Sequence, residues 1–502
     1  MQQQDQFRVA VVGGGVGGAS SAYYLRQLFG NKVSITLFEQ SGRIGGRMKT
    51  VPFCGDMWES GASVFHSSNH YMMSFAKKFK IPFSRLGEAD RRIFFYGEQY
   101  KSIFSNINDS FTFLTPFRLF WHYGVSILNG RLYTASKVEL FTRIYSLQNN
   151  GNCYTTPALL LKALSEDFVE MTKYTYADWL RKKLRVGEKY INEFAFGILS
   201  NNYCQSLDTH AFVGLISSAC TVSDVFTIDG GVEQIPQKLV ETALADNPTD
   251  APKQLVHATV KKITRMDNNR LCLSYELADT KQTEESSFDY VILSMPLHQE
   301  SKLATSDDIK LPQIKYHEMC RTLLTGSINY SLFGLPQKPL GDNQIVSFLP
   351  VANYYTHEKH PIRSIMRLPV KSKDSKEAID GIWSIYSEPK DFPDAKSALS
   401  KLLLENPNDE HNRIDVVRWL AYPTYHPVTD PYTELGEFKL APGVYYPNAI
   451  ELAASCMEMA IIGGRNVALM IANERKSSTV SDENTPLYTK LSNYVNSLFS
   501  NQ

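Results

Sequence analysis

The feature that most constrains this chain is a glycine cluster that follows a short apolar segment near the N-terminus. Residues 7–13 (FRVAVVG) form an almost continuous apolar run, which is typical of a parallel strand buried on both faces. Gly13, Gly15 and Gly18 then form a G-x-G-x-x-G motif. We expect Gly13 to permit a tight turn, Gly15 to let the backbone approach a pyrophosphate, and Gly18 to allow close packing of a helix on the strand.

A helix, a second strand and an acidic residue complete this unit. The helical stretch after Gly18 is stopped by Gly30 and Asn31, and the apolar run at 33–38 leads directly to Glu39. This order of elements gives the glycine motif its weight. We expect Glu39 to accept hydrogen bonds from the ribose hydroxyls of an adenosine, and its charge to disfavour the 2′-phosphate of NADP. A glycine-rich turn that binds nothing is the alternative, and the strand context argues against it.

A second glycine turn follows Glu39. Residues 41–47 (SGRIGGR) place Gly46 between Arg43 and Arg47. A loop of this kind can cover a pyrophosphate and reach beyond it, which favours a long ligand such as FAD over NAD. The alternative is a surface turn with solvated arginines, and the adjacent G-x-G-x-x-G motif disfavours it.

The composition excludes several functional classes. The 502 residues include 52 Lys plus Arg and 52 Asp plus Glu, so the chain has no overall positive surplus for nucleic-acid binding. Hydrophobic residues make up 43% and charged residues 21%, as in ordinary globular proteins, which excludes disorder, collagen and coiled coil for the whole chain. We expect about three domains' worth of chain in one or two large cores.

Metal and dithiol chemistry have little support in the sequence. Seven cysteines are scattered along the chain without a C-x-x-C pair, so neither a zinc ribbon nor a redox dithiol is indicated. His66 and His70 have the spacing of two ligands on one helix face, but no nearby acid or cysteine completes a site. We therefore expect no metal.

Two segments bear on secretion and membranes. Residues 1–6 contain no basic region followed by an apolar one, so we expect a chain that is not secreted unless a targeting segment is missing from it. The aromatic stretch 111–128 is interrupted by Pro116, Arg118 and His122. We therefore expect no transmembrane helix.

Regions of different periodicity alternate along the chain. Residues 69–215 are mostly compatible with helix, 271–277 alternate with a period of two, and a long apolar helix is expected at 452–472. Two interleaved domains explain this order best. We expect a discontinuous FAD-binding domain at 1–68, 215–300 and 420–475, a substrate-binding domain at 69–214 and 301–419, and a linker with a C-terminal helix at 476–502.

Several segments resemble one flavoprotein family. Residues 39–47 (EQSGRIGGR) after a Rossmann strand are similar to the flavin-containing amine oxidase superfamily. Within it the chain most resembles the prenylcysteine oxidase family, called farnesylcysteine lyase in plants. The segments that carry this resemblance are 9–30, 58–72, 201–214, 419–427 and 445–469. The resemblance implies an α/β fold with a Rossmann-like FAD-binding domain of the GR2 type, interleaved with an α+β substrate-binding domain.

The resemblance also implies cofactor-binding residues. The adenosine and pyrophosphate would be held by Gly13, Gly15, Gly18, Glu39, Gly46 and Arg47, and the adenine by the backbone at Val260. Gly61, Ala62 and Ser63, together with the segment from Glu451 to Glu458, would line the flavin ring and ribityl chain. The chain departs from the family at Asn448–Glu451, where a glycine usually precedes the acid, and at Cys204, where glycine is frequent. No cysteine lies in an obvious attachment motif, so we expect non-covalent FAD.

The implied reaction is oxidative cleavage of a thioether. In a farnesyl- or geranylgeranylcysteine, the allylic carbon beside sulfur would lose hydride to the flavin, water would add, and prenyl aldehyde and cysteine would separate. O2 would reoxidise the flavin and give H2O2. Two rivals stay open: an amine or polyene oxidase of the same superfamily, and a prenyl-binding carrier like the Rab escort proteins.

The substrate site should be long, apolar and dry, with a polar end for the amino acid. We expect a tunnel lined by some of Phe111, Phe113, Phe117, Phe120, Trp121, Tyr123, Phe194, Phe196 and Phe212, with ordinary core packing as the alternative for each. His66 is the first candidate for orienting water or polarising the intermediate, and Tyr203 the second. A structural role explains His66 equally well.

The remaining expectations concern partners and location. Besides substrate and O2, a peripheral membrane contact for the prenyl group is considered, and the sequence does not indicate an oligomeric state. The sequons at Asn108 and Asn329 agree with the lysosomal or vacuolar location that the resemblance implies. Without a targeting segment, the chain would instead be cytosolic.

Overall fold

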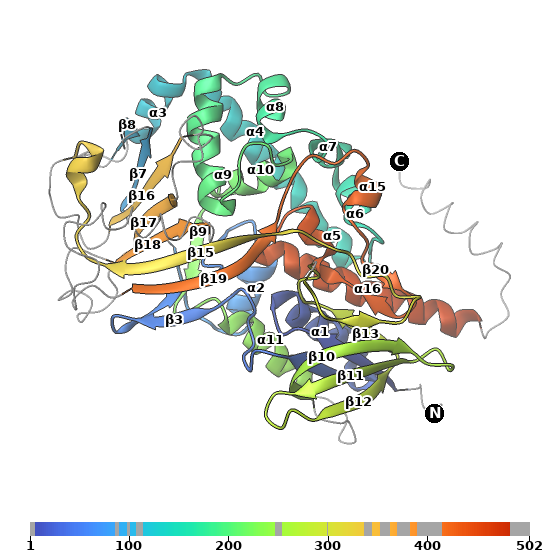
Figure 1. Cartoon of the computed structure of the whole chain (residues 1–502). Coiled ribbons are helices and arrows are strands. Elements are labelled where there is room, and N and C mark those ends of the chain that lie inside the picture. Colours follow the sequence, from blue (N-terminus) through green and yellow to red (C-terminus); the bar gives the residue numbers. More distant parts are fainter. Residues whose placement is uncertain are drawn as a thin grey trace.

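Two large β-sheets and the helices packed on them form most of the molecule (Figure 1). The computed structural model describes residues 6–85, 90–97, 101–106, 114–245, 254–298, 300–335, 344–351, 362–368, 382–388 and 414–481. Within this part of the chain, no helix is long and apolar enough to cross a membrane.

The first sheet has nine strands and a parallel core in the order β10-β2-β1-β13-β21. Every residue of β2 is buried, as expected for a strand covered on both faces. The strands are β1 (Phe7–Val12), β2 (Val33–Glu39), β10 (Leu255–Arg265), β11 (Leu271–Leu277), β12 (Thr283–Phe288), β13 (Tyr290–Leu293), β14 (Ala304–Thr305), β20 (Lys439–Ala441) and β21 (Val444–Tyr445).

The predicted N-terminal unit is confirmed element by element. Helix α1 (Val16–Phe29) connects β1 to β2, and Gly30 follows it with a φ of +56° that a helix cannot continue. The predicted alternation at β11 is also confirmed, because alternate residues of that strand are buried. Strands β10, β11 and β12 form an antiparallel extension in which Tyr275 packs on Phe38 of β2.

The second sheet has seven strands in the order β19-β15-β18-β17-β16-β7-β8 and lies on the left of Figure 1. The strands are β7 (Asp90–Tyr96), β8 (Ser102–Ser105), β15 (Tyr316–Thr325), β16 (Gln344–Pro350), β17 (Ile362–Leu368), β18 (Ile382–Ser387) and β19 (Ile414–Pro423). One face is covered by the short 3₁₀ helix η7 (Tyr330–Phe333). The other faces the helices of the middle of the chain.

The helices surround both sheets. Those of the first sheet are α1, α11 (Gln234–Ala245) and the long α16 (Met457–Ser481), which packs along α1, and α2 (His70–Lys78) contacts α11 and α16. The middle of the chain forms α3 (Thr115–Tyr123), α4 (Val125–Phe141), α5 (Arg143–Asn149), α6 (Pro157–Leu164), α7 (Glu166–Met171), α8 (Tyr176–Lys182), the π-helix η5 (Tyr190–Ala195), α9 (Phe196–Tyr203) and α10 (Ala211–Ser218). The C-terminal third adds α15 (Pro431–Glu434) and the 3₁₀ helix η9 (Pro447–Leu452).

Small sheets connect these layers. Strands β3 (Thr50–Phe53) and β4 (Asp56–Glu59) form a hairpin, and β5 (Phe65–His66) and β6 (Phe83–Arg85) pair with β9 (Val225–Ile228). Helices α2 to α10 confirm the expectation that residues 69–215 are mostly helical, and strands β6, β7 and β8 are the exceptions that the sequence did not predict. They are short and aromatic, and they are stabilised by pairing with distant strands, which a local pattern does not reveal.

The predicted limits of the elements and domains need adjustment. Helix α16 continues to Ser481, beyond the predicted linker start at residue 476, because a helix that is already formed propagates at little cost. Strand β14 lies after the predicted limit at 300 yet pairs with β10, and β19 spans the limit at 420. The C-terminal helix expected near the end of the chain lies outside the described residues.

Candidate functional site

The G-x-G-x-x-G turn has the close approaches that its glycines predict. Gly13 has a φ of +108°, and a Cβ on it would lie 2.5 Å from the carbonyl oxygen of Ser294 in the segment after β13. A Cβ on Gly18 would lie 2.1 Å from the carbonyl oxygen of Gly13. Both distances exclude any side chain, so α1 begins directly against the ends of β1 and β13.

The second glycine loop lies beside the first. The backbone N–H of Gly45 donates to the carbonyl of Gly14 at 2.9 Å, and a Cβ on Gly46 would lie 3.0 Å from Cα of Gly15. A Cβ on Gly15 itself would meet nothing closer than 3.9 Å. The two loops thus form a backbone cradle at the N-terminus of α1 that a side chain at Gly15 would fill, which fits a pyrophosphate.

Glu39 is oriented at the end of β2 by two backbone donors. Its Oε2 accepts from the N–H of Gly14 and its Oε1 from the N–H of Ser41, both at 2.7 Å, and the residue is 8% exposed. Each carboxylate oxygen retains a further acceptor site. The carboxylate lies where β2 meets the glycine turn, an arrangement that fits the hydroxyls of an adenosine ribose.

Val260 lies beyond the end of the parallel pairing. Strand β10 pairs with β2 as far as His257, which is opposite Glu39, and then continues alongside β11. The pairing with β11 is irregular between Val260 and Lys262. Val260 is therefore three residues past His257, the register partner of Glu39, and its predicted contact with adenine stays a prediction.

Arg47, whose side chain is 29% exposed, forms an ion pair with Glu451. Glu451 lies in η9 and is 1% exposed. Arg47 also donates to the carbonyl of Ala421 in β19 at 2.9 Å. Burial alone would lower the pKa of the Arg47 guanidinium, but the adjacent Glu451 carboxylate raises it above its ordinary value. The two residues predicted to contact opposite parts of the cofactor thus contact each other.

Gly61, Ala62 and Ser63 form a loop between the two large sheets. The N–H of Ala62 donates to the carbonyl of Arg47 at 3.0 Å, and the carbonyl of Ser63 accepts from Thr227 of β9 at 3.2 Å. The indole of Trp419 in β19 donates to the carbonyl of Ser60 at 2.7 Å. This loop therefore lies between the glycine cradle and the seven-stranded sheet, at the position predicted to line the flavin.

The carboxylate of Glu458 is engaged by protein groups, and the prediction that its segment lines the flavin stays a prediction. Its carboxylate accepts from the N–H groups of Tyr71 and Met72 at 2.7 and 3.0 Å and from the hydroxyl of Tyr145 at 2.7 Å. These N–H groups are free donors of the first turn of α2. Burial raises the pKa of Glu458 to about 7. Glu458 therefore anchors α2 to α16, a role that depends on partners almost 400 residues away.

The two catalytic candidates differ in what their side chains contact. The hydroxyl of Tyr203 donates to the carbonyl of Ser455 at 3.0 Å, and burial raises its pKa well above the ordinary value. Tyr203 is therefore reassigned to joining α9 with the start of α16. The Nδ1 atom of His66 lies 2.9 Å from the hydroxyl of Ser68, which lies 3.1 Å from that of Ser223. Burial lowers the pKa of His66 to about 4, so its imidazole is neutral at higher pH.

Cys204 occupies a backbone position that suits glycine. It ends α9 with a φ of +51° and is fully buried. The resemblance marks this position as a frequent glycine, and the left-handed conformation is the physical reason. Burial raises the pKa of the Cys204 thiol to about 12, so the thiol is protonated at ordinary pH.

The seven-stranded sheet supplies a residue that the sequence analysis missed. Arg321 of β15 is 4% exposed, and its Nε donates to the hydroxyl of Ser384 in β18 at 2.8 Å. The register puts Arg321 on the same face as Met319, whose partner on β19 is Trp419. Trp419 lies 3.7 Å from the Cβ position of Gly61. The sheet face with Arg321 is therefore the one that reaches the predicted flavin loop.

A local signal could have revealed Arg321. In residues 319–325 (MCRTLLT), the buried part of β15, it is the single charged residue, and a charge on a buried strand requires a partner.

The predicted aromatic tunnel is largely wrong. Phe117, Phe120 and Trp121 are 71%, 44% and 92% exposed, so they line no buried tunnel. Tyr123, Phe196 and Phe212 are buried in the core, and Phe194 is packed against it. Phe111 and Phe113 lie outside the described residues.

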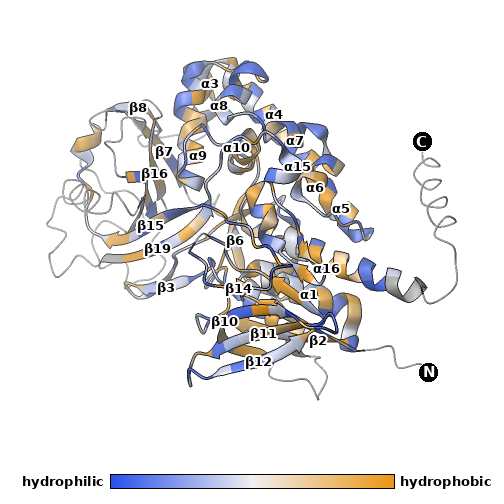
Figure 2. Cartoon of the chain, turned by 45° about the vertical axis from the view of Figure 1, so that its right-hand side comes forward, coloured by the Kyte–Doolittle hydropathy of each residue, from blue (hydrophilic) through white to orange (hydrophobic). Residues whose placement is uncertain are grey.

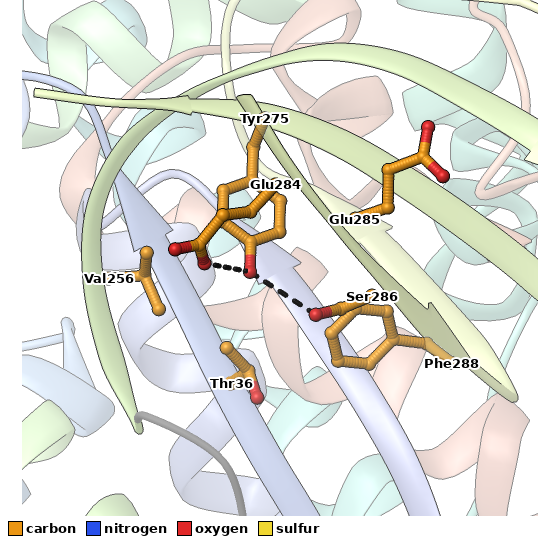
Figure 3. A pocket seen from close by; sticks show the side chains of 7 residues that line it. All are labelled: Thr36, Val256, Tyr275, Glu284, Glu285, Ser286 and Phe288. Atoms are coloured by element: carbon orange, nitrogen blue, oxygen red, sulfur yellow. Dashed lines mark hydrogen bonds between the residues drawn. The ribbon is translucent and has the colours of Figure 1, made fainter. Parts of the chain in front are cut away.

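A cavity of about 380 Å³ lies elsewhere, between the parallel sheet and its antiparallel extension (Figure 3). In it the hydroxyl of Tyr275 lies 3.1 Å from Glu284 and 3.2 Å from Ser286. None of the predicted cofactor residues lines it. The lining residues are Thr36, Val256, Tyr275, Glu284, Glu285, Ser286 and Phe288.

Comparison with known proteins agrees with this geometry. A family model described as prenylcysteine lyase matches residues 107–483, and one for an NAD(P)-binding Rossmann-like domain matches residues 11–79. The chain is 29% identical to human prenylcysteine oxidase 1 over 493 residues, covering 96% of this chain and 92% of the relative. It is 28% identical to bovine prenylcysteine oxidase 1-like, covering 93% and 90%.

Solved structures share the fold. Putrescine oxidase bound to putrescine superposes with a TM-score of 0.59 at 13% identity, over 93% of this chain and 99% of that one. Cyclohexylamine oxidase from Brevibacterium oxydans gives 0.57 at 11% identity, over 94% and 100%. The predicted fold class, a Rossmann-like cofactor domain combined with a second mixed-sheet domain, is thereby confirmed.

We expect the change Glu39→Ala to weaken FAD binding by about 10- to 100-fold, because it removes charge-assisted hydrogen bonds. The measurement is the ratio of flavin to protein absorbance after purification, followed by FAD titration of the apoprotein. Glu39→Gln should lose less, because one oxygen acceptor remains. Exposed Glu241, which pairs with Lys238, provides the control Glu241→Ala. Unchanged flavin content in Glu39→Ala would exclude the ribose contact.

Proposed function

The chain belongs to the prenylcysteine lyase family, and from this premise we propose that it is an FAD-dependent oxidase that cleaves S-prenyl-L-cysteine. Farnesyl- and geranylgeranylcysteine are the proposed substrates, and breakdown of prenylated proteins is the proposed setting. The observation that carries the proposal is the combination of an oriented ribose carboxylate, Glu39, with a buried cation, Arg321, on the sheet face that reaches the flavin loop.

The proposed reaction balances with water and O2 as co-reactants. Non-covalent FAD would accept hydride from the allylic carbon beside sulfur and pass the two electrons to O2, giving H2O2. Oxygen from water would bond to that carbon, the carbon–sulfur bond would break, and the prenyl aldehyde and cysteine would leave. The protein would position the thioether, exclude bulk water and bind the amino-acid head.

Arg321 is the proposed partner of the substrate carboxylate. An arginine can bind a carboxylate through two parallel hydrogen bonds, and one at 4% exposure acts in a medium of low dielectric constant. Its Nε is held by Ser384, which fixes the direction of the guanidinium. The same sheet face also carries apolar and polar side chains from β17. Met366 is the register partner of Ser384, and the hydroxyl of Ser364 donates to Asn201 of α9 at 2.7 Å.

His66 is the proposed group that accepts a proton from the attacking water. Its neutral imidazole can take a proton, and Ser68 and Ser223 orient the ring from the Nδ1 side. It lies three residues after Ser63, in β5. The family also suggests a lysosome or vacuole, where the low pH would leave a group with a pKa of about 4 mostly neutral.

Glycosylation in such a compartment would use the two sequons. Asn329 is half-buried at the start of η7, and Asn108 lies outside the described residues.

Two other functions are compatible with the fold. An amine or polyene oxidase would share the cofactor site, and solved amine oxidases share the architecture. A prenyl-binding carrier needs no oriented ribose carboxylate, so the two backbone bonds to Glu39 favour an oxidase.

We expect the purified chain to be yellow and to consume O2 with S-farnesylcysteine, forming aldehyde and H2O2 in equal amounts. The measurements are the visible spectrum, anaerobic bleaching by substrate and peroxide detection. Putrescine and a polyene serve as comparison substrates. A yellow protein that is bleached only by an amine or a polyene would contradict the prenylcysteine assignment, and a colourless protein would favour the carrier.

We expect Arg321→Met to raise the KM for S-farnesylcysteine about 10- to 100-fold with little change in kcat, because a charge-assisted contact is lost. The methyl ester of the substrate lacks the carboxylate charge, so wild type and variant should use it equally well. Arg321→Lys should lose less than Arg321→Met. An equal rise in KM for acid and ester would instead indicate a structural role for Arg321.

We expect His66→Gln to slow aldehyde release about 100-fold while leaving the rate of flavin reduction unchanged, since water adds after hydride transfer. Stopped-flow absorbance and product quenching separate the two rates. In the wild type, aldehyde release should be constant from pH 8 to about 5 and fall towards pH 4, as the imidazole becomes protonated. The control is His70→Gln, whose ring stacks on Tyr145 outside the site. Unchanged aldehyde release in His66→Gln would contradict the role of His66.

A further inference from the structure

Exposed apolar side chains are concentrated on one helical corner. The structure exposes thirteen large hydrophobic residues within its described part, and seven of them fall between residues 114 and 132. Single exposed hydrophobic residues are normal, but a contiguous group on a protein surface marks an interaction site. We call this group the α3–α4 surface, and it consists of Leu114, Phe117, Phe120, Trp121, Val125, Leu128 and Leu132.

The spacing of these residues explains their grouping within each helix. Intervals of three and four residues place side chains on one face of a helix. The two helices, α3 and α4, are joined through Gly124, whose φ is +59°, and contact each other. Trp121 is 92% exposed, Phe117 71% and Leu132 70%. In both Figure 1 and Figure 2, α3 lies at the opposite end of the molecule from β10, β11 and β12. The corner is therefore an apolar projection of the fold.

A basic segment lies against this corner. The N–H of Gly187 donates to the hydroxyl of Ser126 at 3.0 Å, and Nζ of Lys189 lies 3.3 Å from Nδ1 of His122. The segments 114–132 and 178–189 together contain seven Lys and Arg against two Asp and Glu, a surplus of five in a chain whose net charge is zero. Glu193 adds one acid next to the corner, and it is paired with His122.

We propose that the α3–α4 surface docks on an anionic phospholipid membrane, with Phe117, Trp121 and Leu132 entering the interface and the basic segment facing the lipid headgroups. Aromatic and aliphatic residues on one helical face, flanked by Lys and Arg, are the physical requirement for binding in the plane of a membrane. The charge surplus favours an anionic membrane over a second copy of this chain, because two like-charged corners would repel each other.

If the proposed function holds, membrane docking at the α3–α4 surface would bring the substrate site close to the lipid in which the substrate dissolves. The ring of Tyr123 lies 5.8 Å from that of Phe194, and Phe194 lies 6.1 Å from Phe95. The strand register puts Phe95 of β7 on the same sheet face as Arg321. On that face Phe95 packs against Gly197 of α9. A row of aromatic rings thus connects the surface with the face proposed for the substrate, whose prenyl group partitions into membranes.

The test is co-flotation of the full chain with vesicles, without substrate. Vesicles of phosphatidylcholine alone are compared with vesicles that contain about one third phosphatidylserine. We expect binding to the anionic vesicles. The change F117S/W121S/L132S should reduce the partition constant at least about tenfold. The control L28S/M57S/M266S alters three exposed hydrophobic residues outside the α3–α4 surface, at 44%, 45% and 40% exposure, and should not reduce it. Equal melting temperatures establish that each variant is folded.

The electrostatic part is tested separately. R131Q/K182Q/R185N should lower binding to the level seen with neutral vesicles, and the control K32Q/K262Q/K310Q should bind like wild type. Absence of vesicle binding by the wild type would overturn the proposal, as would a dimer in solution that F117S/W121S/L132S dissociates. Because substrate is absent, these results do not depend on whether the chain oxidises prenylcysteine.

Discussion

The ion pair between Arg47 and the buried Glu451 joins residues that are 404 positions apart in the chain, and the arrangement of the site depends on it. Arg47 follows the second glycine turn, Glu451 belongs to η9, and Ala421 of β19 accepts a further bond from Arg47. Tyr425 donates to the carbonyl of Glu451 at 3.0 Å. Removing two charges from water is costly, so such a pair is weak evidence for stability. The pair instead fixes positions: it holds the second glycine loop, strand β19 and helix η9 next to one another.

Burial controls the charge of the groups around that point. Glu458 is held by three donors at the start of α2, while burial raises its pKa to about 7. Burial has the opposite effect on His66, whose pKa falls to about 4, because desolvation always disfavours the charged form. An imidazole that stays neutral and a backbone cradle with exposed N–H groups suit a site that binds a charged cofactor but needs no strong base. Charged side chains near the site include Arg47, Glu451 and Arg321.

The parts of the fold that were predictable from sequence are those encoded by near neighbours. The unit from β1 to Glu39 spans 33 residues, and its strand, turn and helix signals are all local. The side-chain contacts of Glu458, Tyr203 and Arg321 were not predictable, because their partners lie on distant elements. Phe117 and Trp121 were placed in a tunnel because aromatic residues are usually buried, and only the tertiary structure shows which face of α3 is covered. Cys204 is an intermediate case: the resemblance marked the position, and the φ of +51° supplies the reason.

The overall neutrality of the chain conceals an ordered distribution of polarity. The glycine cradle and Glu39 form a polar end, Arg321 lies on the adjoining sheet face, and the rings of Phe95, Phe194 and Tyr123 lead on to the apolar corner of α3 and α4. A molecule with a charged head and an apolar tail would be bound in only one direction along such a gradient, because reversing it would bury the head among aromatic rings at a cost of several kcal/mol. If the substrate carboxylate binds Arg321, as proposed, the bonds of the cysteine side chain would determine how far the thioether carbon can extend. The distance of Arg321 from the flavin loop would thus determine which substrate bond is oxidised. The aromatic residues beyond Arg321 would determine which apolar tails are accepted.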